Sequence, residues 1–148
     1  MNIEKLKEEL IADEGVVNEI YLDHLGYPTF GIGHLILATD PEHGMPIGTN
    51  VSDDRVHESF VSDISSVLLE CKDLYGHFET LPEECQLIIA NMMFNMGKPR
   101  LSKFKKMKAA IEDQNYIEAA AEMKDSKWYR QVPNRAERLV QRMLSLAV

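Results

Sequence analysis

The sequence has few cysteines, no long apolar run and no secretory signal, and these absences favour an ordinary globular domain. It has two cysteines, Cys71 and Cys85, without the histidine spacing of a zinc site or the cysteine density of a disulfide scaffold, so both are expected to be reduced thiols. No apolar run approaches the roughly 20 residues of a membrane span. The first residues lack the basic and apolar regions of a secretory signal. We therefore expect a protein made and kept in a cytoplasm, with no stable membrane association.

Positive charge is scarce in the first two thirds of the chain. Residues 1–97 hold 4 Lys/Arg against 18 Asp/Glu, a formal charge of −14, whereas residues 98–148 hold 12 against 6, a charge of +6. The acidic majority argues against a nucleic-acid partner, because such binding needs a dominant basic surface. Six of the positive charges fall within residues 98–108. Such a run usually forms a solvent-exposed surface of the protein. The alternative is that it contacts anionic phosphate groups of a cell wall or membrane.

The hydrophobic pattern predicts a β-rich segment followed by helices. Apolar residues recur at helical spacing over 3–13, and residues 20–32 predict a β-hairpin around the turn Asp23–Gly26. A third short strand is expected near Met45–Ile47, and Ser52 is expected to cap a long helix. The spacing Thr80-x-x-Glu83 is typical of a capping box, and Gly97 is expected to end the helix that follows. Further helices are predicted at 104–111, 116–123 and 136–146.

These elements predict an α+β fold within one domain, residues 1–148. A small N-terminal sheet lobe, about 14–55, is expected to be joined to a larger helical lobe by a linking helix, about 52–72. The helical lobe is expected to hold residues of about 73–148 together with the helix 1–13. A cleft is expected between the two lobes.

Glu14, Asp23 and Thr29 are the strongest candidates for chemistry. Two carboxylates nine residues apart flank a turn-rich segment, and a hydroxyl follows six residues later. Paired carboxylates cleave glycosides: one protonates the leaving oxygen and the other acts on the attacking side. The alternatives are an acid exposed at a helix end, a turn aspartate and a strand threonine. The first is disfavoured because a carboxylate near a helix C-terminus faces the negative end of the dipole.

The segment from Glu14 to His34 resembles the phage-type lysozymes, the endolysins of tailed bacteriophages (glycoside hydrolase family 24). The pattern is a Glu, eight residues, an Asp, five residues and a Thr, followed by Gly31-Ile32-Gly33-His34. Similarity continues in Asn91-Met92-Met93-Phe94-Asn95-Met96-Gly97 and in residues 126–136, so it is collinear over nearly the whole chain. Two departures are a shorter segment 38–51 rich in Pro and Gly, and the substrate-contact positions Met107 and Glu122, which do not match.

The resemblance implies roles for further residues. Glu14 is implied as the general acid, and Asp23 and Thr29 as the residues that hold an attacking water. The other implied residues are Leu35 and Phe94 in substrate binding, Arg135 paired with Glu14 and accompanied by Asn95, and His34 in a structural pair with Asp63. A metal site built from His24, His34 and Asp23 lacks ligand spacing, so no metal or cofactor is expected.

By resemblance the protein is an endolysin that hydrolyses the β-1,4 bond between N-acetylmuramic acid and N-acetylglucosamine in peptidoglycan, with inversion. Inversion requires carboxyl groups roughly 6.5–9.5 Å apart. A monomer in the host cytoplasm is expected, with a separate membrane-permeabilising protein (holin) giving access to the wall. The alternatives are a lytic transglycosylase, disfavoured by the presence of Asp23 and Thr29, and a weakly catalytic glycan-binding module, disfavoured by an intact Glu14.

Overall fold

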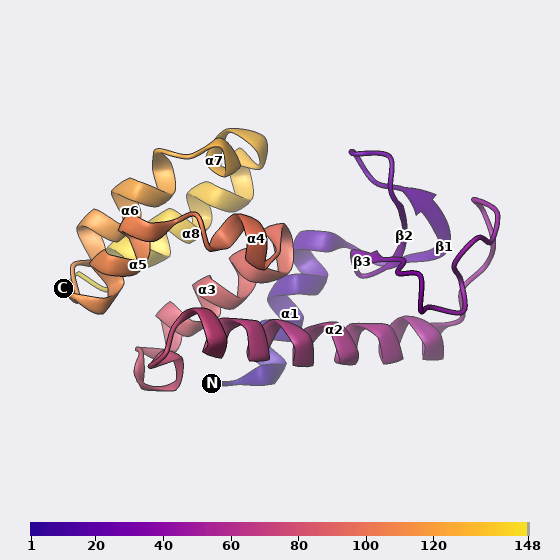
Figure 1. The fold of residues 1–148 in the computed structure, drawn as a ribbon, viewed down its shortest axis with the longest axis horizontal. Helices are drawn as coiled ribbons and strands as arrows, with labels where there is room; N and C mark the ends of the chain where they lie inside the picture. Colours follow the sequence, from indigo (N-terminus) through magenta and orange to yellow (C-terminus); the bar gives the residue numbers. More distant parts are fainter. Residues whose placement is uncertain (148) are drawn as a thin grey trace. The chain divides into compact units, whose positions relative to one another are not determined.

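The computed structural model describes residues 1–147, and Val148, the last residue of the predicted helical lobe, lies outside the described residues. The predicted α+β class is confirmed, because one small sheet falls early in the chain and helices form most of the rest (Figure 1). In chain order the elements are α1 (Ile3–Glu14), β1 (Val17–Leu22), β2 (Pro28–Gly31), β3 (His34–Leu35), α2 (Asp53–Leu74), η1 (Phe78–Thr80), α3 (Glu83–Met96), α4 (Lys98–Leu101), α5 (Lys105–Glu112), α6 (Tyr116–Lys124), α7 (Lys127–Gln131) and α8 (Pro133–Ser145).

The chain divides into two compact units. One, here called the N-terminal unit, is Lys7–Ser66, and the other, the helical unit, is Met1–Leu6 with Val67–Val148. Both boundaries fall inside helices, so α1 and α2 each contribute residues to both units. The N-terminal unit holds 2 Lys/Arg against 12 Asp/Glu, a formal charge of −10.

The strands of the N-terminal unit form one antiparallel sheet in the order β1-β2-β3. Tyr21 lies opposite Thr29 across β1 and β2, while Val17 lies opposite Gly31, so the register shifts between these two pairs. An irregularity of this kind redirects side chains and raises the local twist. The predicted hairpin is confirmed, and the Gly26 N–H donates to the Asp23 carbonyl across its turn at 2.9 Å.

The third strand lies elsewhere than the pattern predicted. β3 is His34–Leu35, which pairs with β2 immediately after the Gly33 turn, and the prediction of a strand at residues 45–47 is wrong. Those residues are exposed loop, although the loop just beyond them meets the other edge of β1 through an isolated bridge between Glu19 and Asn50. Met45 and Ile47 have the composition of a strand, but they bury no apolar face that would stabilise one.

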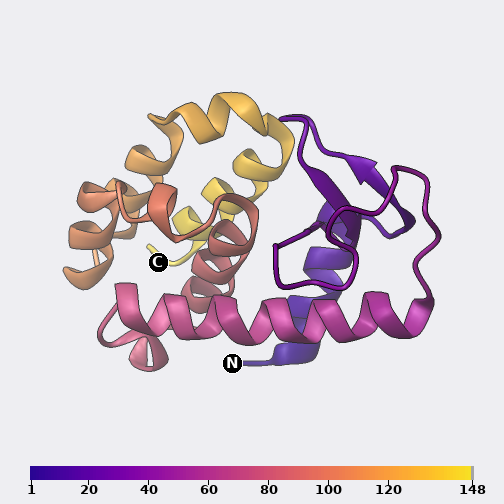
Figure 2. The same cartoon turned by 45° about the vertical axis from the view of Figure 1, so that its right-hand side comes forward.

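The N-terminal unit has a small core. Its buried apolar side chains come from α1, the sheet and the beginning of α2, and they include Leu10, Ile20, Phe30, Val56 and Phe60. Each fully buried side chain of this size stabilises the fold by about 1.5–3 kcal/mol. The loop from residue 36 leads into α2 (Figure 2), where the Ser52 hydroxyl accepts a hydrogen bond from the Arg55 N–H at 3.1 Å. The predicted helix cap at Ser52 is thereby confirmed.

The helical unit is organised around α3, whose residues from Cys85 to Met93 are buried. This all-round burial explains the broad apolar face of the sequence, since a helix at the centre of a bundle has no solvent side. α8 buries a narrower stripe (Ala136, Leu139, Val140, Met143) at helical spacing. Gly97 ends α3 as predicted, at φ 80°. The prediction of a capping box at Thr80 is wrong, because α3 begins after Pro82 and the Thr80 hydroxyl donates to the His77 carbonyl.

Among the described residues, we find no helix with the length and apolar character that crossing a membrane requires.

Candidate active site

The first helix extends one residue further than predicted, so that Glu14 is the last residue of α1, and the Glu14 side chain is half-buried. Its carboxyl group lies against the backbone of Gly33. A β-carbon built at Gly33 would be 3.1 Å from the Cδ of Glu14 and only 2.6 Å from its Oε1, so the carboxyl group would have to move to make room for it. Gly33 also has φ +60°, a conformation that side chains disfavour. The glycine therefore creates the space in which this carboxyl group lies.

Asp23 follows β1 and shapes the turn of the hairpin. Its Oδ1 accepts hydrogen bonds from the backbone N–H groups of Leu25 and Tyr27, both at 2.9 Å, in the manner of an Asx turn. This is the structural role that the turn composition alone suggested. One carboxylate oxygen is thus committed to the turn, and the turn fixes the direction of the other, Oδ2. A half-buried carboxylate held in this way has little freedom to rotate.

Thr29 is buried on β2, with 4% of its surface exposed. Its hydroxyl donates to the Tyr27 carbonyl at 2.9 Å. The same carbonyl accepts from the Asp23 N–H, also at 2.9 Å. The backbone of Tyr27 therefore ties Asp23 and Thr29 to each other. Because the hydroxyl proton is used, the Thr29 oxygen faces any further partner as an acceptor.

Tyr21 was not predicted as a site residue, yet it links the candidates. Its position opposite Thr29 places both side chains on one face of the sheet. The pKa of the Tyr21 phenol is raised above its usual value, first by burial and then by the negative charges of Glu14 and Asp23. Both carboxylates therefore act on a single phenol. Sequence alone could not find this relationship, because it depends on the shifted register of β1.

His34, on β3, lies between two carboxylates. Its Nδ1 is 2.6 Å from Asp63 on α2, so the structure brings together the two residues of the suggested structural pair, and its Nε2 is 2.8 Å from Asp40. Burial lowers the pKa of His34, but the hydrogen bonds and charges of Asp63 and Asp40 outweigh it and raise the pKa overall. Two acceptors on the two ring nitrogens favour the imidazolium, which donates from both.

Arg55 extends this network and was also missed by the sequence analysis. Its guanidinium donates to both oxygens of Glu42 at 2.9 Å and to Asp40 at 3.2 Å, and it lies 5.5 Å above the Phe30 ring. Glu58 accepts a fourth hydrogen bond, at 3.1 Å. The bond from Arg55, more than any other influence, lowers the pKa of Glu42 below its usual value. The loop that precedes α2 is thus anchored by charge.

The remaining predicted residues fall into different parts of the chain. Leu35 is exposed on β3, opposite Thr29. Phe94, Asn95 and Arg135 belong to the helical unit, where Asn95 accepts from the Trp128 indole at 2.7 Å and the Arg135 Nε donates to Asn91 at 2.9 Å. Trp128 is buried with its N–H satisfied, as expected for a core tryptophan. The suggested pair of Glu14 with Arg135 joins the two units and stays a prediction.

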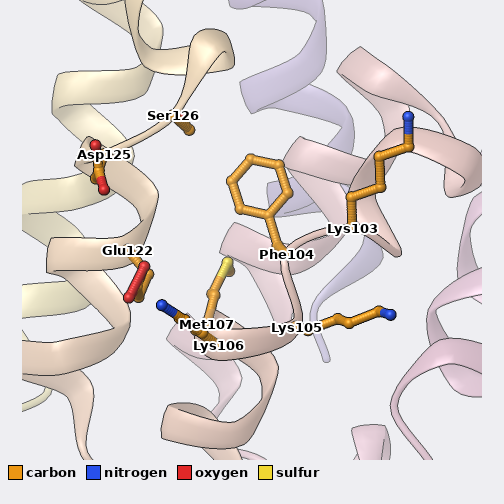
Figure 3. A pocket seen from close by; sticks show the side chains of 8 residues that line it. All are labelled: Lys103, Phe104, Lys105, Lys106, Met107, Glu122, Asp125 and Ser126. Atoms are coloured by element: carbon orange, nitrogen blue, oxygen red, sulfur yellow. The ribbon is translucent and has the colours of Figure 1, made fainter.

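The helical unit has a pocket of about 390 Å³ beside α5 and α6. Met107 and Glu122, the two positions that depart from the family pattern, both line it. Figure 3 shows Phe104 and Met107 between the two elements, with Lys106 pointing toward Glu122. The pocket therefore has a basic side, contributed by the run 98–108, and an acidic side with Glu122 and Asp125.

Within residues 1–147, no group of three or more His, Cys, Asp or Glu side chains is arranged to hold a metal ion. A carboxylate at the end of α1, a second in the turn after β1, and a buried hydroxyl and a phenol on the sheet are groups suited to general acid–base catalysis on a neutral substrate.

Comparison with known proteins identifies the family of the chain. Residues 12–144 match the family described as phage lysozyme. The chain is 32% identical to a probable T4-type lysozyme 1 of Dictyostelium discoideum, over 93% of this chain and 92% of that protein. It is 31% identical to the peptidoglycan hydrolase gp36 of Pseudomonas phage phiKMV and 29% identical to the pre-baseplate central spike protein Gp5 of Enterobacteria phage T4. These matches cover 93% and 95% of this chain but only 15% and 28% of those longer proteins.

The small antiparallel sheet, the mainly helical remainder and the match to phage lysozymes define a lysozyme-like glycoside hydrolase. The chain belongs to the phage lysozyme family.

Proposed function

We propose that the protein hydrolyses the β-1,4 bond between N-acetylmuramic acid and N-acetylglucosamine in bacterial peptidoglycan. One arrangement carries most of the argument: Asp23 and Thr29 are joined through the Tyr27 carbonyl, and Tyr21, opposite Thr29, has a pKa raised by burial and then by the charges of Glu14 and Asp23. Two carboxylates directed at one small region are what glycoside cleavage requires. The peptidoglycan hydrolase of phage phiKMV, similar over 93% of this chain, supports the same substrate.

In the proposed reaction Glu14 is the general acid. The space beside Gly33 holds its carboxyl group at the end of α1, and from there it donates a proton to the glycosidic oxygen as the bond breaks. The leaving sugar departs as an alcohol. The positive charge that develops on the remaining sugar ring is stabilised by the nearby negative carboxylate of Asp23.

Asp23 and Thr29 complete the reaction by holding a water. Asp23 Oδ1 is committed to the turn and the Thr29 proton to Tyr27, so the remaining Asp23 oxygen and the Thr29 oxygen are both acceptors. A water that donates both its protons to these two oxygens presents a lone pair to the anomeric carbon. Attack from this side, opposite the leaving oxygen, inverts the configuration, and Asp23 takes the water's proton.

We further propose that this activity serves host lysis at the end of a phage cycle. The protein would act as a monomer that accumulates in the host cytoplasm and reaches the wall once a separate membrane-permeabilising protein, a holin, has acted. The match of nearly the whole chain to lysozyme sequences supports the wall-degrading activity on which this role depends.

Mass spectrometry of purified peptidoglycan after incubation with the protein tests the proposal, with Glu14→Gln as the inactive control. We expect soluble fragments with reducing muramic-acid ends from the unmodified protein and none from the variant. Anhydro-muramic ends would instead identify a lytic transglycosylase. Binding to peptidoglycan without any soluble fragment would identify a binding module and refute the proposal. Optical analysis of the first-formed anomer decides between inversion and retention.

A further inference from the structure

Tyr21 has an unused hydrogen-bond donor beside the candidate site. Among the residues that the structure describes, none forms a hydrogen bond with its hydroxyl, although the side chain is only partly exposed. Its neighbour across the sheet, Thr29, uses its own proton internally. The hydroxyl is accessible to solvent, so it can donate to water in the free protein, and a ligand acceptor that displaces this water would receive the hydrogen bond.

The surrounding groups are acceptors. Asp23 accepts from two backbone N–H groups, and the Thr29 oxygen is left as an acceptor. Glu14 has one acidic proton, and in the proposed reaction that proton goes to the glycosidic oxygen. Tyr21 itself stays protonated, because its burial and the two negative charges oppose ionisation. Of these four side chains, Tyr21 is therefore the one whose proton is neither used within the protein nor given to the leaving oxygen.

An N-acetylated sugar has one group that needs such a donor. Its hydroxyls donate as well as accept, so they can bind carboxylates, but the acetamido carbonyl only accepts. Beside Glu14, Asp23 and Thr29 that carbonyl would face acceptors alone, and Tyr21 offers it a proton.

Building on the proposed function, we propose that Tyr21 is a substrate-positioning residue whose phenol donates a hydrogen bond to the acetamido carbonyl of the muramic-acid residue undergoing attack. The bond orients the sugar so that its anomeric carbon lies between Glu14 and the water held by Asp23 and Thr29. It also selects N-acetylated over N-deacetylated glycan.

The test combines Tyr21→Phe with a change in the substrate. Glycan strands are prepared in three forms: native, chemically N-deacetylated, and deacetylated then re-N-acetylated. On native strands we expect kcat/KM for Tyr21→Phe to be about tenfold below that of the unmodified protein, the value of one neutral hydrogen bond. On deacetylated strands the two proteins should be about equal, and re-acetylation should restore the difference. The new ammonium group affects both proteins alike, so the double comparison cancels it.

Tyr116→Phe is the matched control, because Tyr116 is also a partly exposed tyrosine whose hydroxyl has no described hydrogen bond, and it lies in the helical unit. It should behave as the unmodified protein on all three substrates. An equal loss for Tyr21→Phe on native and deacetylated strands, or no loss on either, would overturn the proposal. If the variant fails to fold, the unmodified protein still decides: indifference to deacetylation refutes the role. An unmodified protein that cleaves no strand refutes the proposed function itself.

Discussion

The Glu14 carboxyl group lies where a side chain on Gly33 would have to be, with Oε1 only 2.6 Å from the position of a β-carbon there. The last residue of α1 and the turn before β3 are therefore fitted to each other, and the glycine is a condition for the position of the acid.

Gly33→Ala should reduce activity far more than stability. The new methyl displaces the Glu14 carboxyl group, and positive φ costs a non-glycine residue about 1–2 kcal/mol. We expect kcat to fall more than tenfold in the assay of soluble fragments. Gly48→Ala is the control, since Gly48 has φ +90° and nothing within 4 Å of a β-carbon. The unfolding free energy of Gly48→Ala should fall by a similar amount, while its activity is retained. A Gly33→Ala variant with full activity would show that the contact between Gly33 and the Glu14 carboxyl group is not needed for catalysis.

Asp23→Asn should separate the two functions of this carboxyl group. The asparagine carbonyl oxygen still accepts from Leu25 and Tyr27, so the turn and the thermal midpoint should be nearly unchanged. The base and its negative charge are lost, so kcat should fall by about 10²–10⁴. Asp54→Asn, at an exposed acid in the first turn of α2, removes the same charge and should keep full activity. A large drop in the midpoint for Asp23→Asn would mean that the turn itself needs the charge.

The His34 network predicts how stability depends on pH. The pKa of His34 is raised on folding, so its stabilisation is complete below its unfolded pKa of about 6.5 and is lost as pH rises through the higher folded value. Burial raises the pKa of Asp40, but the hydrogen bonds from the Leu37 N–H and His34, with the charge of Arg55, lower it overall. The stabilisation by Asp40 is present above its unfolded pKa of about 3.9 and is lost as pH falls through the folded one.

Urea unfolding of His34→Ala between pH 4 and pH 9 checks this dependence. Near pH 5.5 the variant should be less stable by about 3 kcal/mol, because two carboxylates lose their shared partner, and the difference should shrink at high pH. His57→Ala, an exposed histidine on the same helix, serves as control and should follow the unmodified protein. A pH-independent difference would show that His34 acts by packing alone.

The charge of −10 on the N-terminal unit predicts an unusual response to salt. Bacterial envelopes are anionic, so repulsion should slow the approach of this unit at low ionic strength. Lytic rate should rise toward about 0.1 M salt, where exposed charges are screened beyond about 10 Å. Turbidity loss of permeabilised cells measures it. A steady fall in rate over the same range would instead indicate attraction by the basic run 98–108.

Local signals predicted much of this fold. The turn at Asp23–Gly26, the Ser52 cap and the Gly97 stop are set by residues near each other in sequence, and each is confirmed. The prediction of a strand at 45–47 was wrong because apolar composition does not show whether a neighbouring strand is there to pair with, or a core to pack against. The Thr80 cap failed because Pro82 directly precedes the helix start.

The site was predicted less completely, since its supporting contacts are distant in sequence. Glu14, Asp23 and Thr29 were proposed from their spacing, but the Tyr21–Thr29 pairing depends on a register shift that no pattern reveals. The Arg55 cluster joins residues 13 and 15 positions apart across an irregular loop. Neither relationship leaves a periodic trace in the sequence.

The loop before α2 is held by the ion pairs of Arg55, so a charged and an uncharged denaturant should unfold it differently. Apolar side chains of this loop, including Leu37, Met45 and Ile47, are exposed, while Arg55 is bound to Glu42 and Asp40. Guanidinium chloride is itself a salt and competes for carboxylates, whereas urea is uncharged. The loop should therefore detach in guanidinium at concentrations that leave both cores folded, and should stay in place in urea until the whole N-terminal unit unfolds.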